Sequence, residues 1–411
     1  MQFPLRKALV VGIGNALEFY DFLTFSYFAI QIGRAFFPES QTSHGLLYSL
    51  ATFGLGFVTR PLGGIVIGTY GDRVGRRPAM LLSFSLMGIA ILGMALTPPF
   101  AQIGMAAPIL LLLFRLIQGF ALGGEVGPST AFLIEAAPPG RRGVYVSVQY
   151  ATQGVAILAA GVVGLCLSSS LSDAALESWG WRVAFLLGAA VVPVGLYIRR
   201  NLPETLHDAR APVAAVPSSG ARVPVVLIVL AILMLGSNTT GTYALNYMNT
   251  YAQDSLKLAP HLAFGATITM GICFVVAAPV GGWLSDRMGP KPVMLGAVIT
   301  MLALTLPGYI FLNHWRTPEA LYAVTAVLAF TGQLACVAVM IAIAGALPRT
   351  VRSGGIAMMY AAAVAVFGGS AQFLIKWLMD STGSALAPAW YVSVAMIVGA
   401  VAMLAFPTRA K

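Results

Sequence analysis

Long apolar segments separated by short polar turns run along the whole chain. A membrane-spanning helix needs about 20 predominantly apolar residues, and the pattern contains twelve such segments. They lie at residues 8–33, 45–70, 79–99, 105–136, 143–168, 181–199, 223–251, 262–285, 292–312, 318–346, 354–379 and 388–406. The pattern therefore predicts an all-α membrane protein with twelve transmembrane helices.

The composition agrees with a bilayer location. Hydrophobic residues make up 58% of the chain and charged residues 9%, whereas charged residues make up about 25% of a soluble domain. The first segment is too long for a cleavable signal and carries Glu18 and Asp21, so we expect it to remain as the first span. Cys166, Cys273 and Cys336 lie in separate apolar segments, without pairing or metal-ligand spacing, so we expect no metal site.

Basic residues gather in alternate loops. The formal net charge of +10 could by itself suggest a nucleic-acid partner, but its distribution favours a membrane topology instead. The basic side of the chain includes Arg6, Lys7, Arg73, Arg76, Arg77, Arg141, Arg142, Arg199, Arg200, Arg287, Lys291, Arg349, Arg352, Arg409 and Lys411. By the positive-inside rule this side faces the cytoplasm. We therefore expect both termini in the cytoplasm and no nucleic-acid partner.

A compact charged turn follows the second apolar segment and recurs in the second half of the chain. The first copy contains Gly68, Asp72, Arg73, Gly75 and Arg76, and the second repeats the Asp-Arg pair as Asp286 and Arg287. Such a duplication predicts two related six-helix halves. We expect an N-terminal bundle at 1–200, a cytoplasmic linker at 201–222 and a C-terminal bundle at 223–411.

The two turns resemble the signature loop of the major facilitator superfamily. The first span also carries Gly14-Asn15, then Glu18 and then Tyr20-Asp21-Phe22, a pattern similar to that of the metabolite:proton symporter family. Members of that family carry citrate, 2-oxoglutarate, shikimate, aromatic acids, or proline and betaine. The stretch 116–120 and the short central linker look most like the citrate and tricarboxylate members. The resemblance implies the major facilitator fold, two pseudo-symmetric six-helix bundles and alternating access.

Five charged residues lie deep inside the first four predicted spans, away from the span ends: Glu18, Asp21, Arg60, Arg115 and Glu125. Because each charge at the membrane centre costs at least about 2.5 kcal/mol, such residues mark an ion or substrate route. The resemblance implies that Asp21 and Arg115 form the protonation switch, and we place Glu18 and Glu125 beside it. An acid paired with arginine releases its proton more readily than an acid left alone in an apolar cavity.

Arginine is well suited to bind a carboxylate, because its planar guanidinium can donate two parallel hydrogen bonds. We therefore predict that Arg60 and Arg115 bind the substrate, with Arg60 alternatively satisfying carbonyls freed by Pro61. Polar side chains at span positions extend this candidate site: Gln118, Gln149, Gln153, Tyr243, Asn246 and Tyr360. Gln149 and Gln153 lie on one helical face and could equally join two helices.

The candidate charges balance in a way that couples protons to an anion. The two arginines and three acids sum to −1 if all ionise, so an entering carboxylate is repelled until an acid is protonated. Proton and carboxylate should then favour each other's binding. All four histidines lie in loops or at span ends, so we expect carboxylates to carry the protons. The prediction is a proton-coupled symporter of a small organic carboxylate such as citrate.

The charged turns supply a candidate gate at the cytoplasmic side. Asp72 is expected to approach the start of the eleventh span, where exposed N–H groups favour an anion. The predicted gating set is Gly68, Asp72, Arg73, Gly75, Arg76, Glu135, Arg142, Asp286 and Arg287. The second half has Gly345 at the position that corresponds to Glu135, so one ion pair is expected to be absent there.

Other functions remain open at this stage. Phe19, Tyr20, Phe22 and Phe25 could form an aromatic cage for a zwitterion such as proline or betaine. A proton-driven exporter would usually carry a Gly-Pro motif in the fifth span, whereas 154–164 contains no proline. No nucleophile motif or phosphate loop suggests an enzyme. We expect no cofactor, and a monomer in a bacterial cytoplasmic membrane whose partners are protons, lipid and a small organic anion.

Overall fold

The structure, a computed structural model, describes most of the chain, and its regular elements there are helical. The described residues are 15–16, 19–38, 44–74, 76–123, 130, 133–134, 137–138, 140–200, 223–348 and 351–407. Each of the twelve predicted spans contains helix within these ranges. Eight of the described helices are long and apolar enough to cross a membrane, and the fold agrees with the predicted membrane architecture.

The helices of the first half follow the predicted order. They are α2 (Ala29–Phe36), α3 (Gly45–Leu55), α4 (Arg60–Val74), α5 (Arg76–Leu96), α6 (Phe100–Ile103), α7 (Ala106–Leu122), α9 (Arg142–Ser170), α10 (Asp173–Ala175), η1 (Leu176–Gly180) and α11 (Trp181–Arg200). Residues 19–27 before α2 are also helical. The second span is divided into α3 and α4 by a turn at 56–59. Pro61 therefore lies in the first turn of α4, where its missing N–H costs little.

The second half contains longer uninterrupted helices. They are α12 (Val225–Asn246), α13 (Met248–Asp254), α14 (Pro260–Met288), α15 (Pro290–Trp315), α16 (Pro318–Ala346), α17 (Arg352–Ala363), η3 (Val364–Gly368), α18 (Gly369–Thr382) and α19 (Ala387–Ala405). The π-helix η3 interrupts the eleventh span and ends at Gly368, directly before Gly369. A π-turn of this kind locally changes the helix register.

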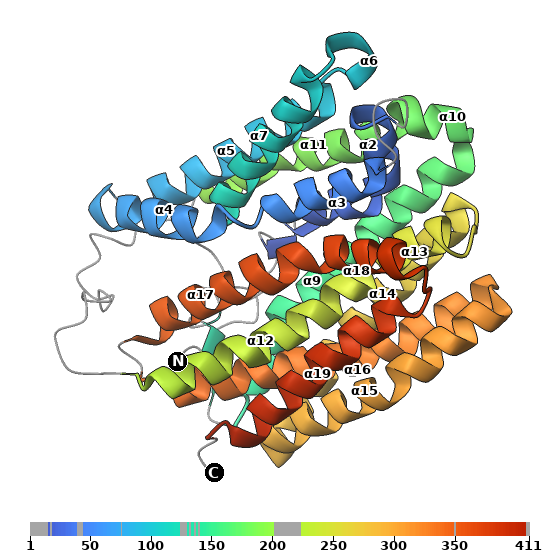
Figure 1. The fold of residues 1–411 in the computed structure, drawn as a ribbon. Coiled ribbons are helices and arrows are strands. Elements are labelled where there is room, and N and C mark those ends of the chain that lie inside the picture. Colours follow the sequence, from blue (N-terminus) through green and yellow to red (C-terminus); the bar gives the residue numbers. More distant parts are fainter. Residues whose placement is uncertain are drawn as a thin grey trace.

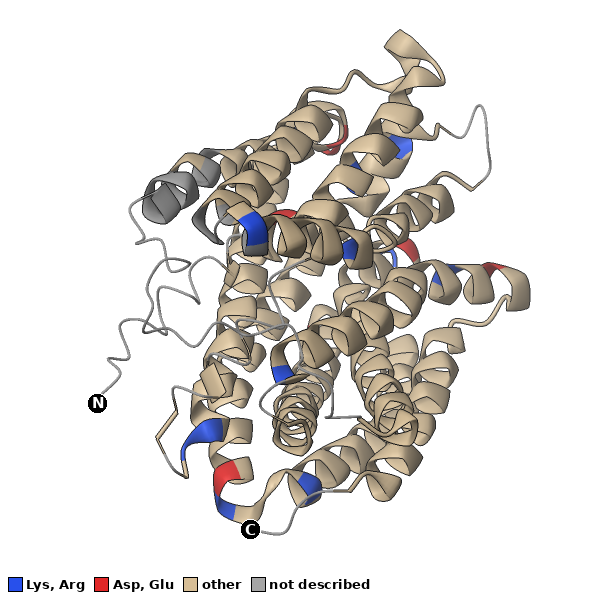
Figure 2. Cartoon of the chain, turned by 90° about the vertical axis from the view of Figure 1, so that its left-hand side faces the viewer, with Lys and Arg blue, Asp and Glu red and all other residues tan. Residues whose placement is uncertain are grey.

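Helices of the two halves meet along two seams. Figure 1 shows α4, α5, α7 and α11 on one side of the molecule, and α12, α14, α15, α16 and α19 on the other. One seam joins α9 to α14, and the second joins α3 and α4 to α18 and α17. Charged residues are sparse along these helices (Figure 2), as expected for a protein that lies in a bilayer.

The seam between α9 and α14 is closed along its length. A Cβ atom at Gly282 would lie 2.7 Å from the carbonyl carbon of Gly143, and one at Gly154 would lie 2.7 Å from the backbone nitrogen of Val275. Nearer the opposite end, a Cβ at Gly161 would be 2.9 Å from the backbone nitrogen of Ile268. Small residues at all these levels let the two backbones approach closely.

The second seam is closed at one end and open at the other. At the closed end, a Cβ at Gly54 on α3 would lie 2.9 Å from the carbonyl carbon of Gly369 on α18. At the end with the charged turns, Gly68 on α4 and Gly354 on α17 have no other atom within 4 Å of a Cβ position. Figure 1 shows α4 and α17 diverging there. Among the described residues, the glycines with open Cβ positions on these two helices thus lie at the end with the charged turns.

Neutral hydrogen bonds join the halves at the closed end. The Ser26 hydroxyl and the Gln372 side chain are linked at 2.7–2.9 Å, and the Tyr27 hydroxyl donates to Asn246 Oδ1 at 2.5 Å. Here the glutamine side chain ties the eleventh span to the first.

The two halves can be compared at equivalent glycines, because Gly68 and Gly282 each lie four residues before the Asp of their charged turn. Gly282→Ala should lower the thermal unfolding temperature of the purified protein by several degrees, because overpacking typically costs about 1–3 kcal/mol. Gly68→Ala is the matched control and should leave that temperature unchanged, since its Cβ enters open space. Equal shifts for the two variants would contradict this description of the seams.

Candidate functional site

Two buried arginines flank a single aromatic ring in the first half. The guanidinium carbon of Arg60 lies 4.4 Å from the centre of the Phe22 ring, and that of Arg115 lies 4.6 Å from it. Arg60 is 7% exposed and Arg115 is fully buried. Three different spans thus bring two cations and one ring together, with cation–π contacts that partly replace water around the guanidinium groups.

Arg115 is held by hydrogen bonds as well as by rings. Its Nη1 donates to Gln118 Oε1 at 2.5 Å, and its Nη2 donates to the Phe53 carbonyl at 3.2 Å. Its guanidinium also lies 4.5 Å from the Phe25 ring and 4.9 Å from the Phe53 ring. Its Nε is buried and has no hydrogen-bond partner. Arg115 therefore keeps an unused donor inside the bundle.

Arg60 begins α4 and has fewer polar contacts than Arg115. Its guanidinium carbon lies 4.4 Å from the centre of the Phe57 ring, the same distance as from the centre of the Phe22 ring. Its Nε is buried without a hydrogen-bond partner, and in the described structure no carbonyl near Pro61 accepts a hydrogen bond from its side chain. The alternative role of satisfying freed carbonyls therefore gains no support, and Arg60 remains available to an anion.

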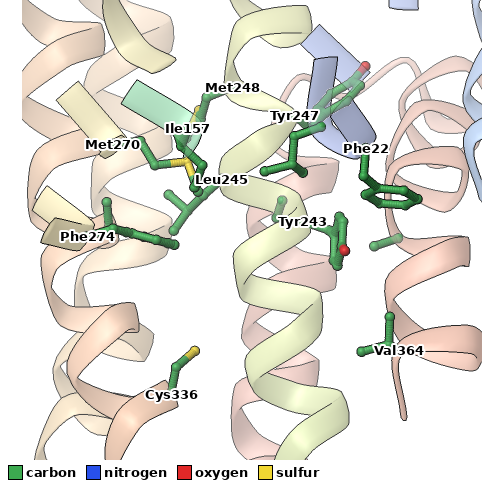
Figure 3. Packing of buried hydrophobic residues seen from close by; sticks show 14 of the residues in the cluster. Phe22, Ile157, Tyr243, Leu245, Tyr247, Met248, Met270, Phe274, Cys336 and Val364 are labelled. Atoms are coloured by element: carbon green, nitrogen blue, oxygen red, sulfur yellow. The ribbon is translucent and has the colours of Figure 1, made fainter. Parts of the chain in front are cut away.

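The second half contributes tyrosines opposite these arginines. The Tyr243 ring packs edge-on against the Phe57 ring at 5.2 Å and lies 6.0 Å from the Phe53 ring. Figure 3 shows Tyr243 on α12 directed toward the side of Phe22, while Leu245 points the other way. Tyr360 of α17 is half-buried and lies within electrostatic range of Arg60. Both predicted tyrosines thus lie near the first of the predicted arginines.

Asp21 is also buried, at 3% exposure, but it does not pair with Arg115. Its Oδ1 has no hydrogen-bond partner and lies against Gly188 of α11. The predicted switch residues are therefore in the same bundle, yet separated from direct contact in this conformation. Glu18 and Glu125, the other predicted acids, lie outside the described residues.

The remaining predicted binding residues have diverse surroundings. Gln118 accepts from Arg115, as described above. Gln149 Oε1 accepts from the Thr130 hydroxyl at 2.8 Å, a bond within the first half that matches the helix-joining alternative. Gln153 is half-buried, and Asn246 is engaged by Tyr27. Their substrate contacts stay predictions.

The second charged turn makes a contact between the halves. Asp286 accepts from the backbone nitrogens of Gly143 at 2.7 Å and Val144 at 3.1 Å, so its carboxylate caps the start of α9, where the helix dipole favours an anion. The side chain of Arg287 lies over the Trp283 ring at 4.2 Å. This is the type of contact that the sequence predicted for Asp72 in the other half.

Other predicted gating residues are less well defined. Gly68, Arg73 and Arg142 are exposed. Gly75 and Glu135 lie outside the described residues, as do the side chains of Asp72 and Arg76. Among the residues that the structure describes, no group of three His, Cys, Asp or Glu side chains could hold a metal ion.

Several residues of the site were missed by sequence reasoning. Phe53 and Phe57 contact the arginines. Phe22, predicted as part of the family pattern and of a cage for a zwitterion, contacts both arginines. In the predicted second span, the spacing of Phe53 and Phe57 would place both on one helical face, a signal that could have been used. Nothing in the sequence singled out Gly188 as the neighbour of Asp21.

Comparisons with known proteins match nearly the whole chain. The family described as sugar (and other) transporter matches residues 7–209 and 213–409. A citrate-proton symporter of Klebsiella pneumoniae is 34% identical over 402 residues, which cover 96% of this chain and 90% of that protein. The alpha-ketoglutarate permease of Escherichia coli (strain K12) is 34% identical, with coverage of 97% and 92%. The proline/betaine transporter of the same strain is 30% identical, with coverage of 96% and 82%.

Solved structures agree with the fold. The proton:xylose symporter XylE bound to 6-bromo-6-deoxy-D-glucose aligns with a TM-score of 0.77 and 17% identity, over 98% of this chain and 95% of that one. The partially occluded inward open conformation of XylE from Escherichia coli aligns with a TM-score of 0.78 and 17% identity, over 98% of each chain. The chain therefore belongs to the major facilitator superfamily, in the family described as sugar (and other) transporter, and resembles the proton symporters of citrate.

Proposed function

We propose that this protein takes up a small organic carboxylate together with protons by alternating access. The observation that supports this most directly is the pair of guanidinium groups around Phe22, each with a buried Nε that lacks a hydrogen-bond partner. Within the described residues, neither arginine has a carboxylate within ion-pair distance. A buried cation without a counter-ion is costly, and an anionic substrate would supply that counter-ion.

The number of cations limits the charge of the substrate. Two guanidinium groups suit a monocarboxylate, a dicarboxylate, or a tricarboxylate that keeps a proton, because a full trianion would remain partly uncompensated. The named substrates of the relatives, citrate and alpha-ketoglutarate, are acids of this class. We take citrate as the first candidate and 2-oxoglutarate as the second.

Asp21 is the proposed proton carrier. Its carboxyl group is buried without a donor to Oδ1, an environment that disfavours a negative charge. Protonation of Asp21 would free the arginines to bind substrate, and its deprotonation beside Arg115 would favour substrate release. Proton transport and substrate transport are then coupled, because ionised Asp21 and the substrate compete for the guanidinium group of Arg115.

The charged turns are the proposed gate. Asp286 already caps α9 from the other half, while the pseudo-equivalent contact of Asp72 with the eleventh span would form when α4 and α17 close. Rocking of the halves would make and break these contacts in turn. We place this gate, and both termini, on the cytoplasmic side of a bacterial inner membrane.

Uptake of a zwitterion is the second candidate, because a proline/betaine transporter is 30% identical to this chain. An aromatic cage for a quaternary ammonium group would need free ring faces, but Phe22 and Phe25 contact Arg115 instead. This arrangement favours the carboxylate. Inhibition of labelled citrate uptake by an excess of unlabelled betaine would support a zwitterion as the substrate instead.

Arg60→Gln should weaken citrate binding by about 10- to 100-fold, because a hydrogen bond to a charged group contributes about 1.5–3 kcal/mol. The measurement is the citrate concentration that raises the unfolding temperature of the purified protein. Arg34→Gln is the matched control, since Arg34 is exposed and already pairs with Glu177. An unchanged citrate response in Arg60→Gln would contradict a substrate-binding role for this residue.

Asp21→Asn should abolish accumulation of labelled citrate in proteoliposomes after an inward proton gradient is imposed, because the carrier of the proton is gone. Exchange of internal for external citrate, which needs no net proton movement, should continue. Accumulation at the wild-type level in this variant would refute Asp21 as the proton carrier.

A further inference from the structure

The carboxyl group of Asp21 fills the space that a side chain at position 188 would occupy. A Cβ built on Gly188 would overlap Oδ1 of Asp21, and would lie 2.9 Å from its Cγ and 3.2 Å from Cε1 of Tyr20. An overlap of this extent requires one of the two groups to shift, so a side chain at position 188 would displace the Asp21 carboxyl from its present place. Gly188 is itself buried, so the place occupied by the carboxyl, here called the niche, lies inside the bundle.

The first span is docked on α11 beside this niche. The Tyr20 hydroxyl donates to the Ala184 carbonyl at 3.1 Å, one helical turn before Gly188. Residues four apart lie on the same face of a helix, so Ala184 and Gly188 present a single face to Tyr20 and Asp21. The hydrogen bond of Tyr20 fixes the height at which Asp21 meets α11.

Among the residues that the structure describes, the niche offers no hydrogen-bond donor to Asp21 Oδ1. On the first span, Tyr20 already donates to Ala184. On α11, Arg182 donates to the Ala95 and Thr97 carbonyls instead. On α7, Arg115 is bound to Gln118 and Phe53. With no donor to Oδ1, the niche suits the neutral, protonated carboxyl.

We propose that Gly188 is a positioning residue for proton coupling: its missing side chain creates the niche that holds the protonated Asp21 carboxyl away from Arg115. This inference rests on the proposed role of Asp21 as proton carrier. Asp21 then alternates between two places, the niche when protonated and Arg115 when ionised. Filling the niche removes the first place and leaves the carboxyl next to the guanidinium.

The test is uptake of labelled citrate by Gly188→Ala in proteoliposomes across a range of pH. The pH of half-maximal uptake should fall by about one unit or more, because an arginine within about 4–6 Å favours the ionised carboxyl by that amount. Gly93→Ala is the matched control, since its Cβ would clash with the Phe114 ring in the same bundle. It should lower the unfolding temperature and leave the pH midpoint unchanged. An unchanged midpoint in Gly188→Ala overturns the inference.

A double-mutant cycle covers the case in which Gly188→Ala is too unstable to transport. Gly188→Ala should lower the unfolding temperature of the wild-type protein but not of Asp21→Ala, where the carboxyl no longer fills the niche. Equal losses in the two backgrounds overturn the inference. Citrate accumulation at the wild-type level by Asp21→Asn would refute Asp21 as the proton carrier, the role on which this inference rests. Abolished accumulation in Asp21→Asn together with a wild-type midpoint in Gly188→Ala would refute only the role of Gly188.

Discussion

The burial of two guanidinium ions in an apolar helix bundle is the constraint on which the rest of the site depends. A charge in such surroundings needs partners, and Arg115 obtains them from Gln118, the Phe53 carbonyl and three rings. Among the described residues, the partners of Arg60 are the rings of Phe22 and Phe57 and the nearby tyrosines of the second half. The uneven supply of partners makes Arg60 the cation with the most to gain from an entering anion.

The same site links the two halves because its components come from both. Phe57 contacts both Arg60 and Tyr243. This one ring therefore connects the Arg60 side chain of the first half to α12 of the second half. Neutral hydrogen bonds and close glycines hold the end of the molecule near Gln372 shut, whereas the ends of α4 and α17 are apart. Movement between two packed arrangements of this kind is what alternating access requires.

Sequence reasoning predicted the elements better than the contacts. The twelve spans follow directly from apolar length. The roles of Phe22, Phe57 and Gly188 depend on how helices distant in sequence turn toward one another, which periodicity does not specify. The charged residues were identified because charge is rare in a membrane span, but the absence of an ion pair between Asp21 and Arg115 required coordinates.

The central claim is that a carboxylate and protons cross the membrane together. Its most direct test is to add citrate outside proteoliposomes that contain the protein and a trapped pH-sensitive dye, with no initial pH gradient. The account predicts that the lumen acidifies as citrate enters, and that liposomes without the protein show no change. Citrate entry without acidification would contradict proton coupling, and neither entry nor acidification would contradict citrate as the substrate.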